Sequence, residues 1–149
     1  MNSGSGMSCG DRDEEFMNKG NQSGKPARSF QDLRVYQNLY KAMVTVLTKI
    51  VPKLPKEEKY DLGSQMSRAC KSPAALIAEG YAKKHHKKSW QKYLDDAIGE
   101  CNEMITHLSI CRDVYGQYVD VKLSEDLIQV YDISGKQLYN LGKSWNSQG

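Results

Sequence analysis

The chain has 149 residues, a length typical of one domain; 39% of them are apolar and 26% are charged. No uncharged apolar stretch approaches the roughly 20 residues that a membrane-spanning helix needs, and the first residues do not resemble a secretory signal. Four cysteines without CxxC spacing predict neither a disulfide framework nor a zinc site. We therefore expect one cytoplasmic domain with no membrane partner.

The net charge of +3 is distributed unevenly along the chain. Residues 1–29 contain four basic and four acidic side chains, which cancel. Residues 81–93 contain five lysines and no acidic residue. This short segment therefore creates a local positive field that attracts anions.

The first 28 residues are rich in glycine, serine and asparagine, and Phe16 is their one large apolar anchor. Such a segment cannot bury enough surface to offset the entropy of ordering it. The sequence predicts a disordered tail over residues 1–28, with at most a short helix near 11–19. The folded domain is then expected over residues 29–149.

The first predicted helix covers about residues 30–51. Ser29 precedes it and Asp32 follows three residues later, a pattern typical of a capping box. Pro52 and Pro55 end the helix, because the residue before a proline avoids helical geometry. Alternating spacings of three and four predict its buried face: Leu33, Tyr36, Tyr40, Met43, Leu47 and Ile50.

The second predicted helix begins near Lys56, where Glu57 and Glu58 suit the positive end of a helix. Pro73 falls inside the pattern and predicts a kink near residues 71–73, because proline removes a backbone donor and clashes with the preceding turn. The predicted buried face consists of Tyr60, Leu62, Met66, Ala69, Cys70, Ile77 and Tyr81.

The third predicted helix has the clearest apolar period, with Ser89 as a candidate N-cap and Gly116 as a candidate stop. Its main stripe is Trp90, Leu94, Ala97, Cys101, Met104, Leu108, Cys111 and Tyr115, and Ile98, Ile105 and Val114 widen it. The stripe is wide enough for packing against two neighbouring helices. The two cysteines on it are expected to act as small buried hydrophobic residues.

The fourth predicted helix is weaker, because Gly135 lies in its middle and costs about 1 kcal/mol relative to alanine. Close approach of another backbone would offset that cost. Its apolar positions are Leu123, Leu127, Ile128, Tyr131, Leu138, Leu141 and Trp145. Four helices, short connections and no period-two strand predict an all-α, antiparallel up-and-down four-helix bundle.

The histidines do not indicate a metal enzyme. Bundle di-iron sites need a Glu-x-x-His motif on each of two helices, whereas Glu103 and His107 form a single pair four residues apart, typical of a surface or interface contact. His85 and His86 adjoin four lysines, which would repel a metal cation. No glycine-rich phosphate loop, nucleophile elbow or Cys–His constellation is present. We expect no catalytic activity, no metal and no cofactor.

The basic segment has two interpretations. One is a solvated loop that keeps the protein soluble. The other is a phosphate-binding site, because the lysines, free amides and helix dipole at the start of the third helix all attract anions. The candidate contacts are Lys83, Lys84, Lys87, Lys88 and Lys92, with Arg68 as a weaker candidate. A few phosphate contacts bind weakly, so useful affinity requires several copies acting together.

Residues 30–145 resemble the four-helix bundle proteins encoded within intervening sequences of bacterial 23S ribosomal RNA genes. These proteins are relatives of the accessory variability protein of diversity-generating retroelements. The most distinctive shared run is Ile77-Ala78-Glu79-Gly80-Tyr81. Others are Phe30-x-Asp32-Leu33-x-Val35-Tyr36, Pro55-Lys56-Glu57-Glu58-x-Tyr60-x-Leu62-x-Ser64-Gln65-Met66-x-Arg68-Ala69, Gly99 with Glu103, and Gly135-Lys136 with Leu138 and Leu141.

The resemblance implies a left-handed bundle that assembles into a homopentamer and has no catalytic activity. It also implies a basic surface that contacts RNA or DNA, or a reverse transcriptase. This chain departs from the family pattern at Pro73, which lies one position early, and at Leu76, where members commonly have asparagine. Two functions stay open: a nucleic-acid-binding oligomer, or an accessory protein that docks on a reverse transcriptase and its RNA.

Overall fold

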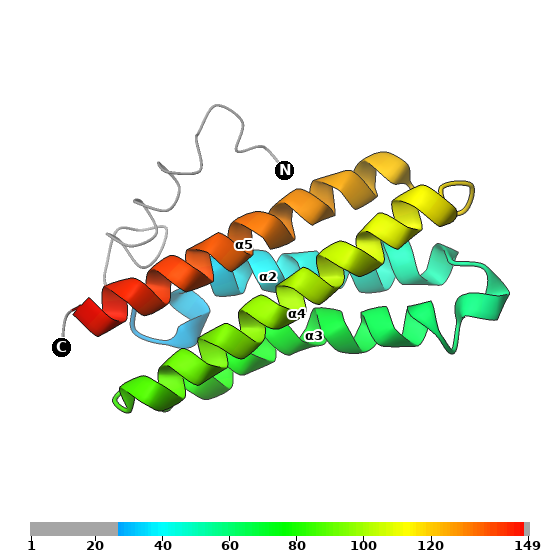
Figure 1. Cartoon of the computed structure of the whole chain (residues 1–149). Coiled ribbons are helices and arrows are strands. Elements are labelled where there is room, and N and C mark those ends of the chain that lie inside the picture. Colours follow the sequence, from blue (N-terminus) through cyan, green and yellow to red (C-terminus); the bar gives the residue numbers. More distant parts are fainter. Residues whose placement is uncertain (1–26, 148–149) are drawn as a thin grey trace.

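The computed structural model describes residues 27–147 (Figure 1). The predicted tail over residues 1–28 therefore lies almost entirely outside the described residues, as does the short helix expected near residues 11–19. Within the described part, no helix is long and apolar enough to cross a bilayer.

Four long helices form the structure: α2 (Arg34–Thr45), α3 (Leu62–Tyr81), α4 (Lys87–Val114) and α5 (Val121–Ser147). Both α2 and α4 pack on α3 and α5, so α2 and α4 lie diagonally across the bundle. Figure 1 shows consecutive helices running in opposite directions. No strand occurs between residues 27 and 147. The predicted all-α four-helix bundle is confirmed.

The capping box at Ser29 is confirmed, but it caps a short 3-10 turn, η1 (Phe30–Asp32), rather than the long helix. The Ser29 hydroxyl accepts the Gln31 N–H at 3.2 Å, and the Asp32 carboxylate accepts the Ser29 N–H at 3.3 Å. Leu33 then has extended backbone angles, so α2 begins only at Arg34.

The end of the first helix also differs in detail from the prediction. The chain continues from α2 into a π-helical turn, η2 (Val46–Ile50), and a 3-10 turn, η3 (Val51–Lys53). Pro52 lies inside η3 and does not stop the helical path. The path ends at Leu54, whose backbone is extended before Pro55. The expected single helix over residues 30–51 is therefore four consecutive helical segments.

The predicted buried face of the first helix is confirmed at its two ends, Leu33 and Ile50, and is wrong by about a quarter of a turn between them. Tyr40 is 48% exposed, and Tyr36, Met43 and Leu47 are only partly buried. The side chains that face the core are Val35, Leu39, Ala42, Val46 and Ile50. Both sets recur at spacings of three and four, so α2 has two adjacent apolar stripes, and the bundle buries the one that the sequence analysis did not select.

The second long helix begins at Leu62 rather than near Lys56. The intervening residues form a separate 3-10 turn, η4 (Lys56–Glu58), and Tyr60 is 85% exposed instead of buried. The cause is Glu58, whose carboxylate accepts the Leu62 N–H at 3.1 Å and the hydroxyl proton of Tyr115 at the end of the neighbouring helix α4. This side chain therefore caps α3 from outside the helix.

α3 continues unbroken through Pro73. Pro73 has no N–H to donate to the Ala69 carbonyl one turn earlier. The Ser72 hydroxyl donates to the neighbouring Arg68 carbonyl at 3.3 Å. A bend at this point stays a prediction.

α4 buries its predicted stripe from Trp90 to Cys111, whereas Val114 is 63% exposed. The predicted N-cap is wrong. The His86 carbonyl already accepts the Trp90 N–H at 2.9 Å, so His86 is the N-cap and Ser89 lies inside the first turn. Gly116 follows the last residues of α4, as predicted.

Two helical glycines have opposite surroundings. A Cβ on Gly80 would lie 2.6 Å from the Tyr93 Cβ and 2.9 Å from the Trp90 ring, so this glycine permits close packing of α3 on α4. A Cβ on Gly135 in α5 would have no described atom within 4 Å. The close approach expected at Gly135 therefore does not come from the described part of the same chain.

Replacing each of these glycines by alanine is expected to change stability in opposite directions. Gly135→Ala should raise the free energy of unfolding by about 1 kcal/mol, because alanine loses less entropy in a helix and meets no clash. Gly80→Ala should lower it by about 2 kcal/mol through overpacking. Guanidinium unfolding of both variants measures the difference, and equal shifts would contradict the packing at Gly80.

The cysteines of the core are expected to be chemically inert. Cys70, Cys101 and Cys111 are buried and free, and burial raises their thiol pKa values to about 11, 12 and 11. At pH 8 only about one thiol in a thousand would be the reactive thiolate at a pKa of about 11. A Cys9→Ser variant removes the cysteine that lies outside the described residues.

In that variant, an aromatic disulfide reagent should label no thiol in native buffer at pH 8 and three thiols in guanidinium. Fast labelling of any thiol in native buffer would contradict the burial of that cysteine.

Candidate nucleic-acid interface

A tight turn of residues 82–86 joins α3 to α4 at one end of the bundle (Figure 1). The Lys83 N–H donates to the Gly80 carbonyl at 2.8 Å, and the His86 N–H donates to the Lys83 carbonyl at 2.9 Å. The turn is therefore fixed by its own backbone. It places Lys83 and Lys84 beside the first turn of α4.

An aromatic cluster supports this end of the bundle. Tyr81, Trp90 and Trp145 contact one another edge-on, with ring centroids 5.7–6.4 Å apart. They come from the end of α3, the start of α4 and the end of α5, and Trp90 is fully buried. These contacts hold the three helix ends together under the lysines.

Three of the lysines are held by neighbouring groups. The Lys83 ammonium donates to the Tyr93 hydroxyl at 3.0 Å, which raises the pKa of Lys83, and that hydroxyl donates to Glu79 at 3.0 Å. The Lys84 ammonium lies 4.3 Å from the centroid of the Tyr81 ring. Lys87 reaches a backbone carbonyl of α5 at 3.5 Å. These contacts orient the side chains and leave their charges uncancelled.

Lys88 differs from the other three. It is exposed, and among residues 27–147 it has no hydrogen bond, ion pair or ring contact. Its ammonium therefore loses no existing partner when it meets an anion.

The start of α4 has an unfavourable charge arrangement. Its first turn contains Lys87 and Lys88 but no acidic residue, and no side chain caps its free N–H groups. Because a helix carries a partial positive charge at its N-terminus, each cation placed there costs about 0.3–1 kcal/mol at low salt. A bound phosphate would satisfy the amides and neutralise the lysines at once.

Two predicted contacts are paired with carboxylates. Lys92 forms an ion pair with Asp96 at 2.9 Å. Arg68 lies thirteen residues before the end of α3, which is about 20 Å along the helix. Its guanidinium bridges Glu100 at 3.4 Å and Glu103 at 2.5 Å, contacts that raise its pKa. Among residues 27–147, four of the six predicted residues therefore form no ion pair with a carboxylate: Lys83, Lys84, Lys87 and Lys88.

The last turn of α5 belongs to the same surface, which sequence reasoning missed. The Asn146 carbonyl accepts from Lys87, and its amide donates to Gln91 at 3.0 Å. Lys143 is exposed three residues earlier on α5. These partners are more than fifty residues apart in the chain, so no local pattern connects them to the lysine turn.

The expected pair between Glu103 and His107 is confirmed, at 3.1 Å. Glu103 also binds Arg68, and together these contacts lower its pKa although burial raises it. Within residues 27–147, no group of three or more histidine, cysteine, aspartate or glutamate residues could hold a metal ion.

Comparison with known families places this geometry in context. The family model of the 23S rRNA-intervening sequence protein matches residues 31–140, from η1 to the last turns of α5, and so includes the whole lysine turn. The chain belongs to this family. No curated protein and no solved structure matches it.

Reversing one charge at the start of α4 is expected to stabilise the isolated protein. Lys88→Glu replaces a repelled cation by a favourable anion at the helix N-terminus, worth about 1 kcal/mol and about 4 °C in melting temperature. Thermal unfolding at low salt in a phosphate-free buffer measures the change. Lys71→Glu, at an exposed position inside α3, changes net charge equally and should show no such gain. A drop in melting temperature for Lys88→Glu would contradict the charge arrangement described here.

Proposed function

We propose that this 23S rRNA-intervening sequence family protein is a non-enzymatic, self-associating nucleic-acid-binding protein of the cytoplasm. Phosphate groups of RNA or DNA bind the turn between α3 and α4 and the start of α4. The contacting side chains are Lys83, Lys84, Lys87 and Lys88. Lys92 and Arg68, which are paired with carboxylates, contribute less.

One observation carries the proposal: an uncapped helix N-terminus that bears lysines instead of acids. A purely structural turn would favour a capping serine or aspartate and an acidic first turn, because both stabilise a helix start. Here the sequence places cations where they reduce stability. Binding of an anionic partner would offset that loss of stability.

The chemistry of the site sets its specificity. Lysines and backbone amides bind phosphate oxygens and do not read base edges, so sequence preference should be low. Four contacts from one subunit give weak, salt-sensitive binding. Self-association multiplies the turn on one particle, and several turns on one strand raise the affinity by effective concentration. The resemblance of this chain to the family suggests that the assembly is a pentamer.

A second function, as an accessory protein of a reverse transcriptase in a diversity-generating retroelement, would use the same lysines on an RNA-bearing partner. The free thiols Cys70, Cys101 and Cys111 fit the reducing conditions of the cytoplasm in either case.

The test compares two variants that each lose four positive charges. In the first, Lys83, Lys84, Lys87 and Lys88 become alanine. In the second, lysines from the opposite end of the bundle become alanine: Lys53, Lys56, Lys59 and Lys122. Fluorescence anisotropy with a 20-nucleotide single-stranded RNA is recorded from 50 to 300 mM salt.

Each phosphate contact on a single strand contributes about 0.7 to the slope of log affinity against log salt. The turn variant should therefore lose about 3 from that slope for each bound subunit, and its affinity at low salt should fall at least tenfold. The control variant should change both values much less. Equal losses in the two variants would reduce the effect to net charge, and no binding by the wild-type protein would overturn the proposal.

A further inference from the structure

We infer that the outer apolar stripe of α2 in one copy docks into the acidic groove between α3 and α4 of a second copy. The inference rests on the self-association in the proposed function and names the two surfaces that would produce it. The groove borders the lysine turn at Glu79, but neither surface contains a lysine of the turn.

The first surface is the stripe of α2 that the bundle covers only in part. Tyr40 and Val44 are 48% and 44% exposed, and Tyr36, Met43 and Leu47 are partly exposed beside them. An aromatic row extends the stripe, because the ring of Tyr36 lies 5.1 Å from Phe30 and 6.1 Å from Tyr40. A continuous apolar face on a helix indicates an interaction site more often than scattered apolar residues do.

The charged side chains of α2 and η2 have one sign. No acidic residue occurs from residue 33 to residue 56, whereas Lys41 and Lys49 are exposed on α2 and η2. The partner of this face is therefore expected to be negatively charged at its rim and apolar at its centre.

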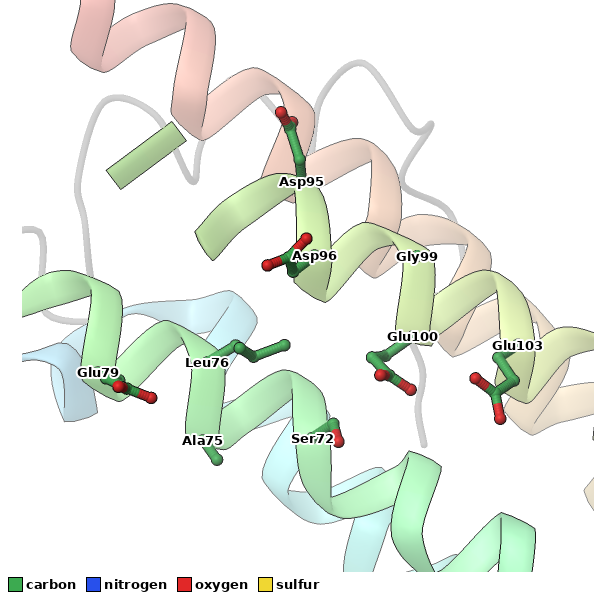
Figure 2. Close-up of a pocket in the computed structure, with 9 residues that line it drawn as sticks. All are labelled: Ser72, Ala75, Leu76, Glu79, Asp95, Asp96, Gly99, Glu100 and Glu103. Carbon is green, nitrogen blue, oxygen red and sulfur yellow. The ribbon is translucent and has the colours of Figure 1, made fainter. Parts of the chain in front are cut away.

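The second surface has these properties. A groove of about 450 Å³ lies between α3 and α4 and is lined by Ser72, Ala75, Leu76, Glu79, Asp95, Asp96, Gly99, Glu100 and Glu103. Figure 2 shows Leu76 of α3 pointing into the space between α3 and α4, with Asp96 of α4 above it and Glu100 of α4 beside it. The centre of the groove is apolar and its rim carries carboxylates.

The charge of the groove is not cancelled within the chain. Five carboxylates line it, and Arg68 and Lys92 are the Arg or Lys side chains that form ion pairs with them among residues 27–147. The remaining negative charge would repel nucleic acid. It complements the lysines that flank the α2 stripe.

Gly99 makes room in this groove. It is exposed in the middle of α4, and a Cβ there would meet no described atom within 4 Å. No contact inside the described chain requires glycine at this position, although glycine weakens a helix interior. A side chain would project into the groove, so glycine keeps the groove open for a helix from another copy.

The two surfaces cannot meet within one molecule. α2 packs on α3 and α5 and lies diagonally across from α4, so the stripe and the groove belong to different faces. Contacts between unlike faces are head-to-tail, and such contacts close into a ring when the rotation between copies allows it. The lysine turn takes no part in the contact, so every copy in the ring can present its turn to a nucleic acid.

The experiment uses two complementary variants of the full chain. The stripe variant is Tyr40→Glu with Val44→Glu, which places like charge against the groove. The groove variant is Gly99→Arg, which fills the groove at an exposed helical position. A matched control, Tyr118→Glu with Val121→Glu, changes residues that are 53% and 39% exposed elsewhere. Circular dichroism and thermal unfolding check the fold of each variant.

Sedimentation equilibrium without nucleic acid gives the decisive result. The wild type and the control should form the same closed oligomer, and each docking variant alone should be a monomer. An equimolar mixture of the two variants should form a heterodimer and nothing larger, because it contains one intact stripe facing one intact groove. This capped dimer is specific to a head-to-tail contact.

Other results would overturn the inference. If either docking variant assembles like the wild type, or if the mixture stays monomeric, the two surfaces do not bind each other. If Tyr40→Glu with Val44→Glu fails to fold, Lys41→Glu replaces it and should weaken assembly at low salt at least tenfold; unchanged assembly would contradict the inference. The quadruple lysine-turn variant should keep the wild-type oligomer, which separates this test from the test of RNA binding.

Discussion

The close approach of α3 and α4 at Gly80 is the constraint on which the cationic end of the bundle depends. Only glycine at this position lets Tyr93 and Trp90 lie directly against α3. That contact brings the two helices near enough for a turn of five residues, and the turn in turn gathers the lysines around the start of α4. It also puts the Tyr93 hydroxyl between Lys83 and Glu79, where it orients the ammonium group. Core packing and the candidate site therefore have one cause.

Charge changes sign along α4, and the order of the signs does not stabilise the helix. The first turn is cationic, whereas Asp95 and Asp96, about two turns later, are exposed acids and Glu100 is a partly buried one. A helix that served only to support the core would carry its acids at the N-terminus. The observed order instead separates an end that attracts polyanions from a flank that repels them. A nucleic acid would be restricted to the end of the bundle, and the flank would be left to a cationic apolar partner.

The sequence predicts the parts of this structure that depend on local residues. The stripe of α4 is correct because that helix is covered on both sides, and the capping box at Ser29 is correct because both partners lie within four residues. The predicted start of α3 is wrong because the position of the Glu58 side chain depends on its hydrogen bond with Tyr115, 57 residues away. The sequence predicts Arg68 as a phosphate contact because its two carboxylate partners lie 32 and 35 residues further along the chain. A local sequence pattern does not include partners at that separation.

α2 shows a different limit of prediction. Its two apolar stripes have the same spacing, so periodicity alone gives no reason to prefer the stripe of Val35 and Leu39 over the stripe of Tyr36 and Tyr40. The outcome depends on how α3 and α5 approach the helix, which is tertiary information. An apolar period reports that a face is buried somewhere, in the monomer or in an assembly. A surface helix with one buried face needs one stripe. The second stripe on α2 is only partly covered by the bundle. A neighbour from a second copy, as proposed above, would cover the rest of it.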